Sequence, residues 1–566
     1  MNPTGQPLTL RINHKRLGLL AAIGLVIFLF LQVFPSTASD TLEIQSTKII
    51  SKEKAAEAAK TFIQSHFDNI TTLGKPIITY QSKSDLYGYL SKENLLKSYN
   101  KKFEKKVPYD VYRVRYTDVD QSGHYIDVDV HMTTGKVVGY TIDSMKSEYS
   151  MNLIFNEKSE QRKQSVQRNL EGNLSLSDKE SLAAPVLKEW GYSKQSLTLV
   201  TKDNEPGLVY TVPNSKIGNS QLELKFSFVD GEIRSFEPTF TVPASHTAYV
   251  KSETTKAKWM TFAGYAFLTF VLGILAIVYS IITRAHTSFK RGIFLTILYF
   301  VISMAGTYNM LPLLEGEGLT DGYLVFGILF QAVFTLFMCA LLYFSLVGGN
   351  GLWKKEGLNP WPRAKEPGYG KYVLNSMIVG YEWAFILLGV QSIIYIILEN
   401  TIHTWSTTDT SQSPYNMLYP WLFPTMAWLA GISEEATYRL FGIKMMKKIV
   451  KNTFLACLIP TIIWAFGHTL YPIYPVVSRP IELIIIGLLF SFIFLRYGFI
   501  AVMFAHVIFD SILMGYGLVT VGGTLNISVG IASIIIPAIV AYIIYLFNPA
   551  KKEKPYVTTP HLEGQQ

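Results

Sequence analysis

The strongest constraint on the fold of this chain is a series of long apolar runs, most of which lie beyond residue 257. Several exceed roughly 18 residues, the length at which a helix can cross the hydrocarbon core of a bilayer. Hydrophobic residues make up 49% of the 566 residues and charged residues 16%, whereas soluble proteins carry about 25% charged residues. The sequence therefore predicts a polytopic α-helical membrane protein.

We predict about ten transmembrane helices. The first runs from Leu17 to Phe34, and the others lie near 258–283, 291–312, 322–347, 373–398, 420–446, 453–470, 481–495, 498–518 and 525–547. The first run is longer than the roughly 7–15 apolar residues of a cleavable signal peptide, so we expect an uncleaved anchor. Small residues at 36–38 leave cleavage open.

The lysine and arginine residues indicate the orientation. They gather in alternate loops, near 284–291, 354–371, 447–451, 496 and 551–554, whereas the intervening loops contain Arg479 alone. By the positive-inside rule, both termini are cytoplasmic and residues 40–255 are extracytoplasmic. Because the basic residues behind the net charge of +9 lie mostly at the ends of apolar runs, we expect the bilayer as partner and no nucleic acid.

Residues 40–255 are polar and predict an α+β region of two repeats. Each pass has a helical stretch followed by alternating runs, such as VYRVRY and LELKFSFV, with turns at Thr134–Lys136 and Asp230–Glu232. Alternation broken by glycine turns is typical of antiparallel hairpins. The order resembles the PepSY-type domains found outside bacterial membranes, and an unrelated α+β domain is the alternative.

The membrane spans also contain ionisable side chains at similar depth. From the rise of a helix, Glu434 and Glu435 lie roughly 18–20 Å from the cytoplasmic boundary near Lys447, and His468 about 21 Å from the boundary near Phe454. His506 and Asp510 lie at about 12 and 18 Å by the same rise. Converging ionisable residues inside a membrane indicate a functional site.

Each of these residues also has a purely structural interpretation. Glu435 and Arg439 are four residues apart on one helical face and could form a neutralising ion pair. His468 alone could be a hydrogen-bonded histidine between helices, and Asp510 could merely orient His506. Glu482, on the next span, is expected at the outer interface.

The cluster suits hydrolysis of a carbonyl substrate within the membrane. Burial makes a glutamate such as Glu434 a competent general base for water, and histidines can position that water or donate to an oxyanion. Glu434, His468 and His506 are also ligand types that zinc accepts, but their spacing is not HExxH. Zinc or another divalent metal and a metal-free mechanism both stay open. Cys339 and Cys457 lie within apolar runs and form no framework of disulfides or metal ligands.

Three motifs carry a family resemblance: EExxxR at Glu434, Glu435 and Arg439, the pair Trp464 and His468, and HxxxD at His506 and Asp510. They resemble the CPBP family of intramembrane proteases, which includes CAAX prenyl and bacteriocin-processing proteases and is also called the Abi or type II CAAX endopeptidase family. Two positions depart from the family pattern, since the second motif usually begins with Phe and the third often ends in Asn.

The resemblance implies a role for each residue of the site. Glu434 and His468 would activate water, and His506 and Asp510 would stabilise the tetrahedral intermediate. The supporting residues would be Glu435, Arg439 and Trp464. The family is described as metalloproteases, although a metal-free glutamate mechanism is also argued for it.

These observations divide the chain into five parts. They are a cytoplasmic start and anchor (1–39), the extracytoplasmic region (40–255), four transmembrane helices (256–415), the catalytic core (416–520), and a last helix with a cytoplasmic tail (521–566). We expect an endopeptidase acting on a membrane-associated peptide or protein. The alternatives are a non-catalytic scaffold or immunity protein and an ion-coupled transporter.

Overall fold

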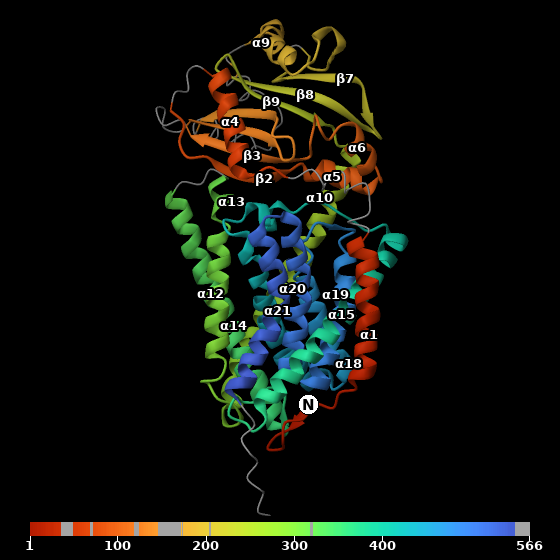
Figure 1. Ribbon diagram of the computed structural model, residues 1–566, viewed down its shortest axis with the longest axis vertical. Coiled ribbons are helices and arrows are strands. Elements are labelled where there is room, and N and C mark those ends of the chain that lie inside the picture. The colour runs from red at the N-terminus through yellow and green to blue at the C-terminus, as the bar shows by residue number, and fades with distance from the viewer. Residues whose placement is uncertain are drawn as a thin grey trace, which may run out of the picture.

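The computed structural model describes residues 1–34, 49–67, 72–117, 124–144, 171, 174–202, 205–316 and 321–548. A β-sheet domain, whose elements lie between residues 52 and 240, stands on one end of a bundle of long helices (Figure 1). The fold is therefore a polytopic helical membrane protein with an amino-terminal α+β region, as predicted. The small residues at 36–38 and the tail beyond 548 lie outside the described residues.

The domain contains one antiparallel sheet of eight strands in the order β2-β3-β4-β5-β9-β8-β7-β6. The strands are β2 (Ile77–Ser82), β3 (Asp110–Thr117), β4 (His124–His131), β5 (Val137–Ser144), β6 (Thr198–Leu199), β7 (Leu208–Ile217), β8 (Ser220–Val229) and β9 (Glu232–Phe240). Helix α4 (Lys52–His66) precedes the first four strands, and α9 (Leu176–Glu189) precedes the last four. The two sets meet where β5 pairs with β9, at Tyr140 opposite Phe236.

Alternating apolar side chains bury one face of this sheet beneath α4 and α9. Ala59 and Ile63 of α4, Leu187 of α9, and Val128 and Phe236 of the sheet belong to one buried cluster. Two shorter helices, α5 (Ser84–Lys92) and α6 (Leu96–Lys102), are inserted between β2 and β3. The division into two repeats and the PepSY-type resemblance stay predictions.

The β8–β9 turn lies at the predicted place. Asp230 and Gly231 have φ angles of 50° and 86°, and two consecutive residues with positive φ form the tight turn that suits a two-residue hairpin.

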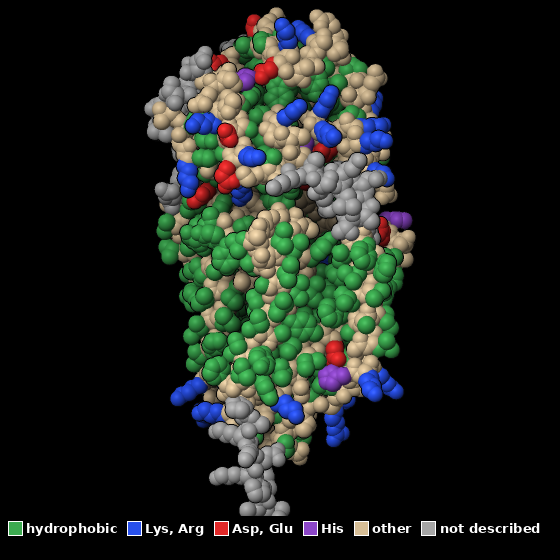
Figure 2. Space-filling model, viewed as in Figure 1, with side chains coloured by type: hydrophobic (Ala, Val, Ile, Leu, Met, Phe, Trp, Pro, Cys, Tyr) green, Lys and Arg blue, Asp and Glu red, His purple; other side chains and the backbone are tan. Residues whose placement is uncertain are grey.

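Within the described part of the chain, eight helical segments are long and apolar enough to cross a membrane. They comprise α1 (His14–Phe28) with η1 (Leu29–Val33), α10 (Ala244–Trp259) with η3 (Met260–Phe267) and α11 (Leu268–Ile282), α12 (Ile293–Asn309) with α13 (Leu311–Gly316), α14 (Asp321–Lys355), α15 (Tyr369–Ile402), α19 (Ser478–Tyr497), α20 (Phe499–Val521) and α21 (Thr524–Phe547). Their exposed side chains form the apolar belt in Figure 2.

The two remaining predicted spans have other forms. Helix α18 (Thr453–Phe466) is shorter than the predicted span at 453–470. The span at 420–446 consists of the 3-10 segment η7 (Pro420–Thr425), α16 (Met426–Glu434), the π-helical segment η8 (Glu435–Ile443) and α17 (Lys444–Val450). The estimate of about ten spans therefore corresponds to eight long segments and these two irregular ones.

The first helix after the sheet is continuous with the sheet domain. Strand β9 ends at Phe240, and the helix that begins at Ala244 runs to Ile282. Its first turns therefore lie within the range that the sequence analysis assigned to the extracytoplasmic region.

The two predicted groups of loops gather at opposite ends of the bundle. Strand β1 (Asn2–Pro3) pairs with β10 (Leu358–Asn359), and the Met1 amine lies 3.3 Å from the carbonyl oxygen of Arg496. This amino-terminal end is opposite the sheet domain (Figure 1). The loops predicted to be outside instead contact the sheet, since the amide of Asn416 pairs with the backbone of Tyr80 at 2.6 and 3.0 Å.

Candidate active site

Glu434 and Glu435 lie where α16 passes into the π-helical segment η8. π-helical turns occur frequently at functional sites. Helix α16 packs closely on α20, because a Cβ at Gly431 would lie 2.5 Å from the side chain of Val507. A glycine here therefore lets the helix with the two glutamates approach the helix with His506.

Helix α20 is positioned by the turn that precedes it. Gly498 separates α19 from α20 with a φ of 94°, in the region that favours glycine. A Cβ at this position would lie 2.8 Å from the carbonyl oxygen of Pro360. This turn sets where α20 begins. Within α20, His506 and Asp510 are four residues apart and therefore lie one helical turn apart on the same face.

Glu435 connects the arginine and one histidine of the site. Its Oε1 accepts from Arg439 at 3.0 Å and lies 2.7 Å from His506 Nδ1. Glu435 and Arg439 are fully buried, and His506 is 4% exposed. The pairing of Glu435 with Arg439 was predicted from their spacing, whereas the contact with His506 was not.

This connection determines the role of His506 Nδ1. A carboxylate that accepts from a guanidinium is ionised, so Nδ1 of His506 must be the donor to Glu435. Nε2 then lies 3.4 Å from Asp510 Oδ2 and 3.9 Å from Glu434 Oε2. His506 therefore presents one nitrogen to two further carboxyl groups, where a proton can be held or transferred.

Aromatic rings cover the buried side of this cluster. The Arg439 guanidinium lies 4.4 Å from the ring centroid of Trp464 and 5.3 Å from that of Phe490. Phe490 also stacks on His506, with ring centroids 4.5 Å apart. The faces of these rings attract the guanidinium, and by excluding water they lower the local dielectric. Both effects strengthen the interactions of Arg439 within the cluster.

Trp464 has a polar contact as well, because its indole Nε1–H donates to Glu434 Oε2. The Glu434 side chain is 24% exposed and that of Asp510 is 19% exposed, whereas Trp464 is 2% exposed. The two carboxyl groups can therefore meet a substrate or water, and the tryptophan orients one of them from the buried side.

His468 is less directly connected than the sequence analysis expected. Its Nδ1 lies 3.0 Å from the carbonyl oxygen of Trp464, to which it donates, and its ring is 5.2 Å from the Trp464 ring. Within the described residues, no hydrogen bond or ion pair joins His468 to Glu434, His506 or Asp510. His468 therefore borders the cluster through Trp464, with Nε2 left as an acceptor.

The described residues contain no group of three or more His, Cys, Asp and Glu side chains placed to hold a metal ion. The suggested ligand set of Glu434, His468 and His506 is not assembled in this arrangement, so no step below is routed through a metal. A zinc requirement stays a prediction. Cys339 and Cys457 are free and buried.

The sequence analysis did not single out two contributors to the site. Phe490 covers His506, and the carbonyl oxygen of Gly487 lies 3.5 Å from Arg439 Nη2. Both come from α19, on which the sequence analysis named no residue of the site. Glu482, near the start of the same helix, is fully buried within the protein and pairs with Arg479 at 2.6 Å; its position at the outer interface stays a prediction.

Comparison with known proteins places this cluster inside a family match. Residues 416–512 match the family model described as Type II CAAX prenyl endopeptidase Rce1-like. The range contains every predicted catalytic residue and confirms the family resemblance for the membrane core. At the level of the family, the match supports a CAAX-type endopeptidase.

A curated relative supports the same assignment. The sporulation-killing factor biosynthesis protein SkfC of Bacillus subtilis (strain 168) is 26% identical over 251 residues, which are 43% of this chain and 44% of the relative. The chain thus matches less than half the length of that relative. No solved structure matches the chain.

Proposed function

We propose that the chain is an intramembrane endopeptidase that hydrolyses a peptide bond with water activated by Glu434. The observation that carries this proposal is a cluster of four ionisable side chains within an apolar bundle. Glu435 and His506 are buried and paired with each other, whereas Glu434 and Asp510 are partly accessible. Carboxyl groups that differ in exposure and partners suit separate proton-transfer roles. The family match over these residues supports the reaction class.

The geometry supports a division of labour. Glu434, held by the Trp464 N–H, removes a proton from the attacking water and later gives it to the leaving amine. His506 Nε2 and Asp510 lie beside Glu434. With a proton on Nε2 and on the Asp510 carboxyl group, both donate hydrogen bonds to the oxyanion that develops on the carbonyl. Glu435 and Arg439 are positioning residues, because they touch His506 or its support rather than the reacting atoms.

His468 has a different place in this scheme than the resemblance implied. Its Nδ1–H is occupied by the Trp464 carbonyl oxygen, so Nε2 is the atom that can accept a hydrogen bond from water. We therefore assign His468 to orienting the water at the edge of the site. A requirement for zinc is tested by assaying cleavage after dialysis against a chelator, with and without added Zn²⁺.

The orientation of the chain forms part of the proposal. The basic loops and the amino terminus share one end of the bundle, which the positive-inside rule assigns to the cytoplasm. The sheet domain then lies outside the membrane, where it can meet the exposed part of a substrate. The name of the relative refers to biosynthesis of a killing factor, which favours a membrane-associated peptide as substrate.

The test compares the peptide termini formed in cells that express the wild type or Glu434→Gln. Gln keeps the size of the side chain and removes the base. Glu399→Gln is the matched control, because Glu399 is an exposed glutamate at the end of α15. Termini present with wild type and control but absent with Glu434→Gln would support the protease. Identical termini for all three folded proteins would favour the scaffold or transporter.

A further inference from the structure

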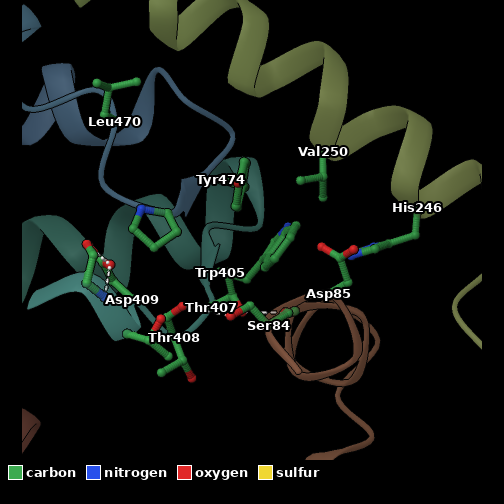
Figure 3. Close-up of a pocket in the computed structure, with 14 residues that line it drawn as sticks. Ser84, Asp85, His246, Val250, Trp405, Thr407, Thr408, Asp409, Leu470 and Tyr474 are labelled. Atoms are coloured by element: carbon green, nitrogen blue, oxygen red, sulfur yellow. Dashed lines mark hydrogen bonds between the residues drawn. The ribbon is translucent and has the colours of Figure 1, made fainter. Parts of the chain in front are cut away.

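A cleft of about 300 Å³ lies where the sheet domain meets the outer loops of the bundle (Figure 3). Its lining comes from helix α5 of the sheet domain, from the first turns of α10, and from the segments 405–411 and 470–474. Neither the motifs nor the proposed catalytic cluster includes these residues. The cleft is therefore a separate feature at the junction of the two parts of the chain.

The cleft adjoins the catalytic cluster through the loop after α18. Tyr471 stacks on His468 with ring centroids 6.0 Å apart, and Leu470 and Pro472 on either side of Tyr471 line the cleft. Leu470 follows His468 by two residues, so their Cα atoms are within about 7 Å. The loop after α18 therefore contributes both to one wall of the cleft and to the edge of the proposed active site.

Hydrogen bonds hold this loop against the rest of the structure. Strand β11 (Trp405–Ser406) pairs with β12 (Ile473–Tyr474), and the Trp405 and Tyr474 rings stack 4.6 Å apart. The backbone N–H of Val476 donates to Glu253 of α10 at 2.8 Å. The wall of the cleft is thus a built surface, fixed to both the sheet domain and the membrane helices.

The charge of the cleft is negative. Its lining residues, all of them described, include the carboxylates of Asp85 and Asp409 and no lysine or arginine. One oxygen of Asp409 accepts from the N–H and hydroxyl of Ser411, at 3.0 and 2.5 Å. Lys92, at the end of α5, is not a lining residue, and its ammonium lies over the Tyr249 ring, 4.8 Å from the ring centroid. The cleft therefore favours a positively charged ligand.

A second and independent observation is His246 on α10. This side chain is 3% exposed, and neither ring nitrogen has a hydrogen-bond partner among the described residues. Its ring lies 5.7 Å from that of Tyr89 and 5.3 Å from that of Trp405, and Figure 3 shows it pointing toward the Asp85 carboxylate. A buried polar group without a partner is costly, and a neutral imidazole nitrogen can accept from an ammonium N–H.

Apart from Gly88, the other lining residues are the hydroxyl-bearing Ser84, Thr407, Thr408, Thr410 and Ser411, and an apolar wall of Val250, Trp405, Leu470, Pro472 and Tyr474. Such a wall suits a ligand with an apolar stem and a compact charged end, which describes lysine. We propose that the cleft binds a lysine side chain in the extramembrane segment of the peptide substrate. The four-carbon stem packs on the apolar wall, His246 accepts one ammonium N–H, and Asp85 and Asp409 balance the charge.

This inference rests on the proposed function for its substrate, but its test does not need cleavage. The full chain carrying Glu434→Gln is reconstituted in nanodiscs and mixed with a synthetic dodecapeptide of Gly and Ser. The peptide contains one Lys beside a photoreactive residue, and both ends are blocked so that lysine is its sole charge. Illumination should cross-link the peptide to the segments 84–88, 405–411 or 470–474. Acetylating the lysine should lower the yield at least fivefold.

Variants of the protein locate the effect. Asp85→Asn should lower the cross-linking yield about fivefold, as expected for loss of one exposed charge pair, and Asp409→Asn provides a second test if the first variant is unstable. The control is Glu232→Gln, since Glu232 is an exposed carboxylate at the β8–β9 turn. It should leave the yield unchanged.

Several results would overturn the inference. They are equal yields for the lysine and acetyl-lysine peptides, cross-links that map away from the cleft, and equal yields for wild-type and substituted clefts. A peptide with acetyl-lysine and a free amino terminus that cross-links as well as the lysine peptide would also refute it, because the ligand would then be the terminal amine. Cleavage in cells that depends on Glu434 but not on the cleft would refute this inference and leave the proposed function intact.

Discussion

The indole N–H of Trp464 is the most specific part of the proposed mechanism, because the family motif usually has Phe at this position. Trp464→Phe removes the hydrogen bond to Glu434 and keeps an aromatic ring beside Arg439. A hydrogen bond to a charged group contributes about 1.5–3 kcal/mol, which corresponds to roughly a 10- to 150-fold lower kcat. KM should change little, because Trp464 is 2% exposed and lies behind the carboxylate.

Trp383→Phe provides the matched control. Trp383 is also buried, and its indole nitrogen has no hydrogen-bond partner among the described residues. The same change of side chain there removes packing but no hydrogen bond to the site. The assay measures kcat and KM for a cleaved peptide with both variants in nanodiscs, together with their thermal unfolding. Equal kcat values for the two variants, at similar stability, would refute the role assigned to Trp464.

Two further predictions concern stability. Glu435→Gln should lower the free energy of unfolding by about 3–5 kcal/mol, because it leaves the buried Arg439 charge uncompensated; denaturant unfolding in detergent measures this, and an unchanged midpoint would contradict it. In the sheet domain, burial raises the pKa of Asp110, whose carboxylate accepts from the Tyr80 hydroxyl at 2.9 Å. Because the pKa of Asp110 is higher in the folded protein than in the unfolded chain, ionisation of Asp110 destabilises the fold at any pH above its unfolded pKa. Asp110→Asn should therefore raise the melting temperature at pH 7. The gain should vanish near pH 3, where both states are protonated, and a gain of equal size at both pH values would be inconsistent with this cause.

The length of the apolar runs was sufficient to predict the membrane class and the approximate number of spans. The breaks within the span at 420–446 were not predictable, because hydropathy measures how apolar a segment is and not its backbone geometry. Pro420 and Pro424 lie in the 3-10 turn of that span, and the π-helical segment begins at Glu435. The sequence similarly gave no sign that the helix from Ala244 continues without a break into the bundle.

Within the site, local spacing predicted local pairs. The four-residue separations of Glu435 from Arg439 and of His506 from Asp510 correspond to contacts of 3.0 and 3.4 Å. Contacts between helices depend on their rotation and register, which one sequence does not contain. The bond from His506 to Glu435, and the indirect position of His468, therefore emerged only from the structure.

Similar depth in the membrane was a useful but incomplete guide. It placed Glu434, His506 and Asp510 at one level, and they do meet. The same argument also grouped His468 with them, although depth says nothing of the direction in which a side chain points. The residues of the cleft carry no motif at all, since the fold brings α5 beside loops that lie far along the chain.

The central claim is that Glu434 activates the water. The most direct measurement is the rate at which purified wild type and Glu434→Gln, reconstituted in nanodiscs, cleave a peptide identified from the cellular termini. Loss of a general base lowers the rate by about 10²- to 10⁴-fold, and we expect a loss in this range with unchanged thermal unfolding. A folded Glu434→Gln protein that cleaves within a few-fold of the wild-type rate would contradict the account.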